Sequence, residues 1–205
     1  MAGPVTQNIM LQYGVGFSEK SKTGSDLEKR VLSRSGSYPA QGLKEMTSII
    51  RPFRDAELVS LCHLIHKTIE VCYSGVYPER AVEFFKDYHS ENRILERSRK
   101  GEILVIDRHG DLIGTGALVG TEILGVFIQP EIQGHGFGKT IMNELEKRAG
   151  AEGISEISLS VSLPSRRFYE ALGYELLEEQ FLDMGEGQRL FYWPARTTIR
   201  REDRQ

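Results

Sequence analysis

The chain has 205 residues, of which 40% are hydrophobic and 27% charged, an ordinary composition for a globular protein with a sizeable core. Its 26 basic and 29 acidic residues give a net charge of −3, so no overall positive field attracts nucleic acid. The longest uncharged apolar run, residues 123–128, is far too short to cross a membrane. We therefore expect one domain that has neither a nucleic-acid nor a membrane partner.

The two cysteines, Cys62 and Cys72, point to a reducing environment. Both fall in one expected helix, where ten residues of spacing separate them by about 15 Å along the axis. No disulfide spans that distance. The chain also opens without a basic segment followed by an apolar stretch, so no secretory signal is expected. These features predict a cytoplasmic protein.

The first part of the chain lacks the pattern of a packed domain. Residues 1–46 hold six Gly and six Ser without a sustained helical or strand period, which predicts a flexible N-terminal extension. A strand-like run follows at residues 46–51, and Asp55 is placed to cap the next helix. Three helices are expected after that strand, at residues 56–72, 79–88 and 91–98.

From residue 102 the apolar period changes to that of strands. Arg108–Asp111 has the composition of a hairpin turn, and Gly150 is placed as a helix C-cap. The expected order is strands at 102–107, 112–119 and 122–128, a helix at 136–149, a strand at 154–161, a helix at 164–172, and strands at 174–181 and 188–193. We expect an α/β fold in which residues 47–195 form one domain and residues 196–205 a charged tail.

A glycine-rich loop, Gln133–Thr140, lies between an expected strand and an expected helix. Its backbone N–H groups, together with a helix N-terminus, are suited to bind phosphate or pyrophosphate. A nucleotide-binding loop of the Walker A type requires glycine where Gln133 stands, and a dinucleotide fingerprint requires glycine where Lys139 stands. Both of these alternatives are disfavoured.

A third pattern fits the loop, because Gln133, Gly136 and Gly138 satisfy [QR]-x-x-G-x-[GA]. The block Phe168–Tyr174, with the sequence FYEALGY, follows the next strand. Together, the segment from Leu124 through this loop and the FYEALGY block resemble the GCN5-related N-acetyltransferase (GNAT) superfamily, and the resemblance covers residues 47–193. It implies a mixed, mostly antiparallel central sheet with two splayed parallel strands, flanked by helices.

The resemblance implies acetyl-CoA as cosubstrate, held where the strands at 122–128 and 154–161 part. The backbone of the first strand would pair with pantetheine, and the loop N–H groups would hold the pyrophosphate. His135 stands where arginine is common, and Ser162 where asparagine is common. The implied cofactor-binding residues are Val126, Phe127, Ile128, Gln133, Gly134, His135, Gly136, Phe137, Gly138, Lys139, Ser162 and Ser165.

Two residues align with catalytic positions of the superfamily. Tyr169 aligns with a general acid that protonates the leaving thiolate, and its alternative role is packing beside Phe168. Glu122 is the candidate base for the amine nucleophile, and its alternative is a solvated glutamate at a strand end. No metal is implied.

The implied reaction is transfer of an acetyl group to a primary amine by direct attack, with a small molecule favoured over a protein as acceptor. A non-catalytic CoA-binding or sensory domain of the same fold is the alternative. Glu70, Tyr73 and Tyr77 lie in the segment that forms one lip of the acceptor cleft in the superfamily, although core packing suits both tyrosines as well. His89 is expected to be exposed at a helix end. The expected oligomeric state is a monomer or a homodimer.

Overall fold

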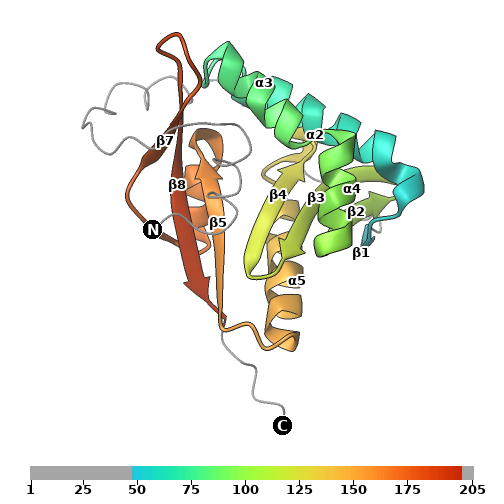
Figure 1. Cartoon of the computed structure of the whole chain (residues 1–205). Helices are drawn as coiled ribbons and strands as arrows, with labels where there is room; N and C mark the ends of the chain where they lie inside the picture. Colours follow the sequence, from blue (N-terminus) through green and yellow to red (C-terminus); the bar gives the residue numbers. More distant parts are fainter. Residues whose placement is uncertain (1–47, 200–205) are drawn as a thin grey trace.

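A computed structural model describes residues 48–199, which form an eight-stranded mixed sheet with helices packed against it (Figure 1). The strand order is β1-β2-β3-β4-β5-β8-β6, and β7 also pairs with β8. All paired strands are antiparallel except β4 and β5. The strands are β1 (Ile49–Pro52), β2 (Glu102–Arg108), β3 (Asp111–Val119), β4 (Glu122–Ile128), β5 (Glu156–Ser162), β6 (Glu175–Leu176), β7 (Gln180–Asp183) and β8 (Arg189–Thr198).

Helices cover both faces of this sheet. The α-helices are α2 (Leu58–Tyr73), α3 (Glu79–Tyr88), α4 (Glu91–Lys100), α5 (Phe137–Ala151) and α6 (Arg166–Ala171). Short 3-10 turns precede or link them: η2 (Asp55–Glu57), η3 (Pro130–Ile132) and η4 (Leu163–Ser165). Helices α2 and α3 pack on one face, while α5 and α6 pack on the other. This is the mixed α/β architecture that the sequence predicts.

The core lies in two layers, one on each face of the sheet. Strand β2 illustrates this arrangement. Four consecutive side chains of β2 are buried, and alternate ones point to opposite faces of the sheet. Ile103 and Val105 pack with α2 and α3, whereas Leu104 and Ile106 pack with α5. Full burial of each such side chain stabilises the fold by roughly 1.5–3 kcal/mol. The central strands are therefore packed on both faces.

The expected strand at 174–181 was wrong, because it is divided into β6 and β7. Both pair with β8, but the register shifts by one residue between Leu176, opposite Ala195, and Gln180, opposite Tyr192. Pro194 lies in β8 at this break, and a proline has no N–H to donate to a neighbouring strand. Strand β8 itself extends to Thr198, farther than the expected 188–193.

Two expected helix caps were also wrong. Helix α5 runs through Gly150 to Ala151, and a Cβ at Gly150 would lie 3.2 Å from Ile199 Cγ2, so this glycine serves close packing. Asp55 is not a cap: Arg54 is the N-cap of η2, and its N–H donates to the Glu57 carboxylate at 3.2 Å. The predicted extension, residues 1–46, lies outside the described residues.

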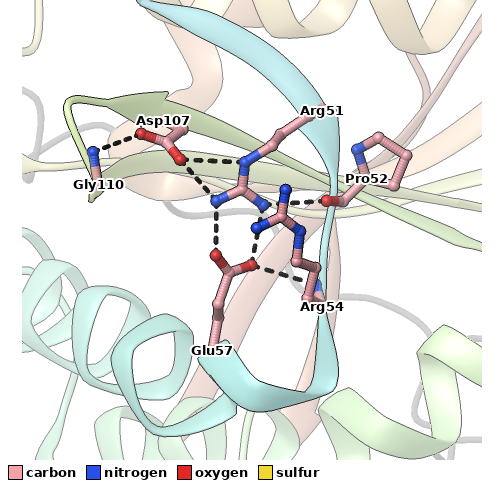
Figure 2. A network of polar contacts seen from close by, with 6 residues as sticks. All are labelled: Arg51, Pro52, Arg54, Glu57, Asp107 and Gly110. Carbon is pink, nitrogen blue, oxygen red and sulfur yellow. Dashed lines mark hydrogen bonds and ion pairs between the residues drawn. The ribbon is translucent and has the colours of Figure 1, made fainter.

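A network centred on Arg51 fastens β1 to its neighbours (Figure 2). The guanidinium donates to both carboxylate oxygens of Glu57, at 2.9 and 2.5 Å, and to Asp107 Oδ2 at 3.0 and 2.6 Å. Asp107 also accepts from the N–H of Gly110 in the β2–β3 turn. The Arg51 side chain is 12% exposed, and its hydrogen bonds lower the pKa of both carboxyl groups.

We predict that Arg51→Met lowers the melting temperature at pH 7 by several degrees, because two carboxylates then lie together without their cation. Depressed carboxyl pKa values stabilise the folded state above the unfolded value of about 4, and this stability is lost as pH falls through the folded values. The difference between wild type and variant should therefore shrink at pH 3. Thermal denaturation at both pH values measures this.

Lys100→Met is the matched control, since it removes an exposed cation that pairs with Glu96 and should change stability little. Equal losses for Arg51→Met and Lys100→Met, or a loss at pH 3 as large as at pH 7, would contradict the role assigned to the network.

Candidate active site

The two halves of the sheet are joined by one backbone pairing between β4 and β5. Glu122 pairs with Ser158, and the Ser158 N–H donates to the carbonyl of Thr121 at 3.0 Å. Beyond this point the strands diverge, so the rest of β4 has a strand partner on one side only (Figure 1). Its other edge presents peptide groups that an extended ligand can pair with.

A bulge at Gly125 bends β4 along this free edge. The register with β3 shifts between Thr115 and Ala117, and Gly125 has a φ of +59°, which disfavours other residues. A Cβ at this glycine would lie 3.1 Å from His89 Cε1 and 3.3 Å from Arg97 Nη1. The bulge therefore depends on glycine both for its conformation and for its close contact with these two buried side chains.

A cavity of about 580 Å³ opens where β4 ends and α5 begins. It is bordered by β4, the glycine loop and the start of α5, and α2, η4 and α6 contribute to its walls. The expected cofactor residues in its lining are Val126, Phe127, Ile128, Gln133, Gly134, Gly136, Phe137, Gly138, Lys139 and Ser165. The structure thus brings ten of the twelve together.

The glycine loop delivers backbone donors to this cavity. Gly134 and Gly136 have φ values of +80° and +89°, in the left-handed region that favours glycine. Gly136 is the N-cap of α5, whose first N–H groups have no partner within the helix. Gly138 follows, and a Cβ there would lie 3.1 Å from the Phe168 ring. These glycines let the chain turn closely, and the helix start favours an anionic group.

The side chains of Gln133 and His135 are engaged within the protein. Gln133 Nε2 donates to the carbonyl of Ile128 at 2.9 Å and lies 3.5 Å from Cys72 Sγ, so it ties the loop to β4 and α2. His135 Nδ1 lies 3.1 Å from the carbonyl of Ile132, and His135 does not line the larger cavity. Gln133 therefore supports the loop, and His135 folds back on it.

A second cavity, of about 130 Å³, adjoins the first. Residues that line both are Tyr73, Val126, Phe127, Ser165 and Tyr169. Glu122 lines only the smaller cavity and is 6% exposed, so it is not the solvated strand-end glutamate of the alternative interpretation. Ser162 also lines only the smaller cavity. The two candidate catalytic side chains thus border one space.

Tyr169 lies at the junction of the two cavities. Its ring contacts Phe168 and Tyr174 edge to face, at centroid distances of 5.0 and 5.6 Å, while its hydroxyl makes no hydrogen bond to another described residue. Burial, and then the negative charge that Tyr73 can carry, raise the pKa of Tyr169 well above its ordinary value. The hydroxyl therefore stays protonated at neutral pH and can donate a hydrogen bond.

Tyr73 closes the other side of this junction. Its hydroxyl lies 3.0 Å from Ser162 Oγ, which lies 2.8 Å from Ser165 Oγ, and burial raises the pKa of Tyr73 to about 12. Of the other expected cleft residues, Tyr77 bonds to the Leu163 N–H and the Phe191 carbonyl and lines neither cavity. Glu70 pairs with Lys86 and lines neither cavity.

The prediction for His89 was wrong, because its side chain is 4% exposed and lines the smaller cavity. Arg97 Nη1 donates to His89 Nδ1 over 3.2 Å. Burial, followed by the charge of Arg97, lowers the pKa of His89 well below its ordinary value, so its ring is neutral. The sequence places His89 directly after an amphipathic helix. It does not reveal that the β4 bulge at Gly125 packs on this side chain.

Sequence reasoning also missed the aromatic wall of the smaller cavity. The sequence analysis assigned no site role to Phe84, Phe85, Tyr88 or Tyr192. All four line the cavity. The spacing of Phe84 and Tyr88 at i and i+4 was the available signal, and their rings lie parallel at 6.2 Å.

Comparison with known proteins identifies the family. A profile of the acetyltransferase (GNAT) family matches residues 63–174, more than half of the chain, so the chain belongs to this family of acetyltransferases. No curated protein matches the sequence.

Solved structures share the fold. A GCN5-related N-acetyltransferase from Rhodopseudomonas palustris superposes with a TM-score of 0.68 at 21% identity, covering 75% of this chain and 98% of its own. The PaiA N-acetyltransferase from Thermoplasma acidophilum, in complex with coenzyme A, gives 0.62 at 23% identity, covering 75% and 99%. A ribosomal-protein-alanine N-acetyltransferase from Brucella melitensis gives 0.57 at 17% identity, covering 74% and 99%. They confirm the expected fold with its two splayed parallel strands.

Two further observations concern residues 48–199. They contain no group of three or more His, Cys, Asp or Glu side chains placed to hold a metal ion. None of their helices has the length and apolar character that a membrane span requires.

We predict that Gly125→Ala destabilises the protein more than Gly110→Ala does. Both glycines have positive φ, but a Cβ at Gly110 meets open space, whereas one at Gly125 presses on His89 and Arg97. Each alanine costs roughly 1–3 kcal/mol in backbone strain, and the crowding at Gly125 adds to that cost. Urea denaturation of both variants measures the difference. Equal losses of unfolding free energy would show that the bulge does not depend on this contact.

Proposed function

We propose that the protein transfers an acetyl group from acetyl-CoA to a primary amine. The observation that carries this proposal is the arrangement of two adjoining cavities with Tyr169 at their junction. The larger cavity has a free strand edge and a glycine loop, which suit a thioester cosubstrate. The smaller cavity can hold the amine nucleophile beside Glu122. A domain that only binds CoA would have no need of the second cavity.

The larger cavity fits acetyl-CoA in both of its polar parts. The unpaired edge of β4 at residues 126–128 offers peptide groups to the pantetheine amides. The loop N–H groups of 134–139, with Lys139 nearby, offer donors and positive charge to the pyrophosphate. His135 and Ser162 lie outside this lining, and we assign no contact with acetyl-CoA to their side chains.

The chemistry follows from the groups at the junction. The amine nitrogen attacks the thioester carbonyl carbon, a C–N bond forms and the C–S bond breaks. Glu122 takes the proton that the amine must lose, directly or through water. Tyr169 donates its hydroxyl hydrogen bond to the leaving sulfur, whose thiol form has an ordinary pKa of about 8.5. The products are an N-acetyl amine and CoA.

We also propose a cytoplasmic setting for this activity. Cys62 and Cys72 are both free thiols, which agrees with a reducing, cytoplasmic environment. A small molecule stays favoured over a protein as acceptor. The monomeric or homodimeric state stays a prediction.

We predict that acetyl-CoA raises the melting temperature of wild type with increasing concentration, and that Gly136→Asp abolishes this rise. The aspartate adds a side chain and a negative charge where the pyrophosphate would bind. Gly110→Asp is the matched control, because it introduces the same residue at another positive φ, far along the chain in a hairpin turn. Differential scanning fluorimetry measures the shifts. An unchanged shift in Gly136→Asp would remove the loop from the cofactor site.

We predict that Tyr169→Phe lowers turnover by roughly 10²-fold or more, the usual range for loss of an acid catalyst. The KM for acetyl-CoA should change little, since the hydroxyl acts mainly in the transition state. Because the pKa of Tyr169 is raised, wild-type activity should show no alkaline loss from this group below its ordinary pKa of about 10.

Tyr174→Phe is the control for that experiment. Tyr174 packs on Tyr169 and donates to Glu146 at 2.8 Å, but lines neither cavity. The Tyr174→Phe variant should be less stable than wild type but should not show a comparable loss of turnover. Wild-type turnover in Tyr169→Phe, with an acceptor that the wild type acetylates, would leave Tyr169 with a packing role only.

A further inference from the structure

Seven of the 19 residues that line the smaller cavity are Phe or Tyr. Helix α3 contributes Phe84, Phe85 and Tyr88, while β4 and β8 contribute Phe127 and Tyr192. These rings are fixed by one another: Phe84 lies parallel to Tyr88 at 6.2 Å, and Phe84 meets Phe85 at an interplanar angle of 70°. Aromatic walls attract apolar groups, and their ring faces also attract ammonium cations.

The volume of the cavity limits what enters it. It measures about 130 Å³. An apolar protein cavity of about 150 Å³ holds one benzene molecule. The group that enters is therefore close to a single ring or a short branched chain in size. An extended polyamine or a peptide with several ordered side chains does not fit within it.

The charges around the cavity favour an acceptor with one cationic group. Among the described residues that line the cavity, Glu122 is the one acidic side chain, and none is a Lys or an Arg. His89 is neutral, since its pKa is lowered. Arg97 lies behind this wall, 8% exposed, with its N–H groups directed at His89 Nδ1 and the Tyr88 carbonyl. An acceptor carboxylate or a second ammonium therefore meets no opposite charge in the lining.

Tyr192 adds one polar group to this lining. Its hydroxyl is buried and makes no hydrogen bond with the described part of the chain. Burial raises its pKa to about 12, so it remains a hydroxyl at neutral pH. Tyr192 therefore adds a neutral polar group to the cavity and no charge that would attract a carboxylate or a second ammonium.

We propose that the acceptor is a primary amine carried by one compact apolar group the size of a phenyl ring, as in an arylalkylamine. The apolar group of the acceptor occupies the smaller cavity. Its amine nitrogen lies between Glu122 and Tyr169, which both line that cavity. This inference rests on the proposed acetyl transfer and specifies its substrate class.

The test is the initial rate of thiol release by the full-length protein with acetyl-CoA and four amines. They are 2-phenylethylamine, spermidine, alanine, and a short peptide with an N-terminal alanine. We expect kcat/KM for 2-phenylethylamine to exceed the others by about tenfold or more, the discrimination that an apolar pocket supplies. Preference for any of the other three overturns the inference and leaves acetyl transfer standing. Thiol release with none of the four overturns the inference; if acetyl-CoA also fails to raise the melting temperature, the proposed acetyl transfer is overturned with it.

Ser160 offers a second test, because its side chain is exposed on β5 and lines only the smaller cavity. Ser160→Phe should fill the cavity and lower kcat/KM for 2-phenylethylamine about tenfold or more. The thermal shift with acetyl-CoA should stay at the wild-type value. Glu156→Phe is the matched control, because Glu156 is exposed on the same strand and lines neither cavity, so this variant should retain wild-type kcat/KM. Equal kcat/KM for Ser160→Phe and Glu156→Phe, with 2-phenylethylamine turned over, places the acceptor elsewhere and overturns the inference.

Discussion

One backbone pairing, that of Glu122 with Ser158, joins the two halves of the sheet before β4 and β5 diverge. The bulge at Gly125 accompanies this divergence and is packed against His89 and Arg97. An unpaired strand edge inside a protein is costly unless a ligand or water satisfies it. The same geometry that leaves β4 incomplete therefore creates a place for an extended cosubstrate.

The position of Tyr169 depends on this divergence as well. Helix α6 follows β5 directly through η4, so the place of Tyr169 is set by the strand that moves away from β4. Tyr169 is then one of five residues that line both cavities, and Glu122 lies where the strands are still paired. The family provides the acetyl-transfer chemistry, while the aromatic wall of the smaller cavity is the feature through which this chain would select its acceptor.

The sequence predicted local features well and long-range ones poorly. β4 and α3 have the expected bounds because their apolar periods and flanking turns are local signals. The glycine loop was recognised for the same reason. The division of β6 from β7 depends on Pro194 in a different strand, and the burial of His89 depends on a bulge 36 residues away. Neither partner is visible in the local pattern, and the aromatic wall likewise draws on α3, β4 and β8.

The most direct test of this account is a crystal structure of the full-length protein with coenzyme A. The account predicts pantetheine along residues 126–128 of β4, pyrophosphate at the N–H groups of the loop 134–139, and the thiol sulfur within hydrogen-bonding distance of the Tyr169 hydroxyl. Coenzyme A bound away from the divergence of β4 and β5, or a sulfur remote from Tyr169 in a fully ordered ligand, would contradict it.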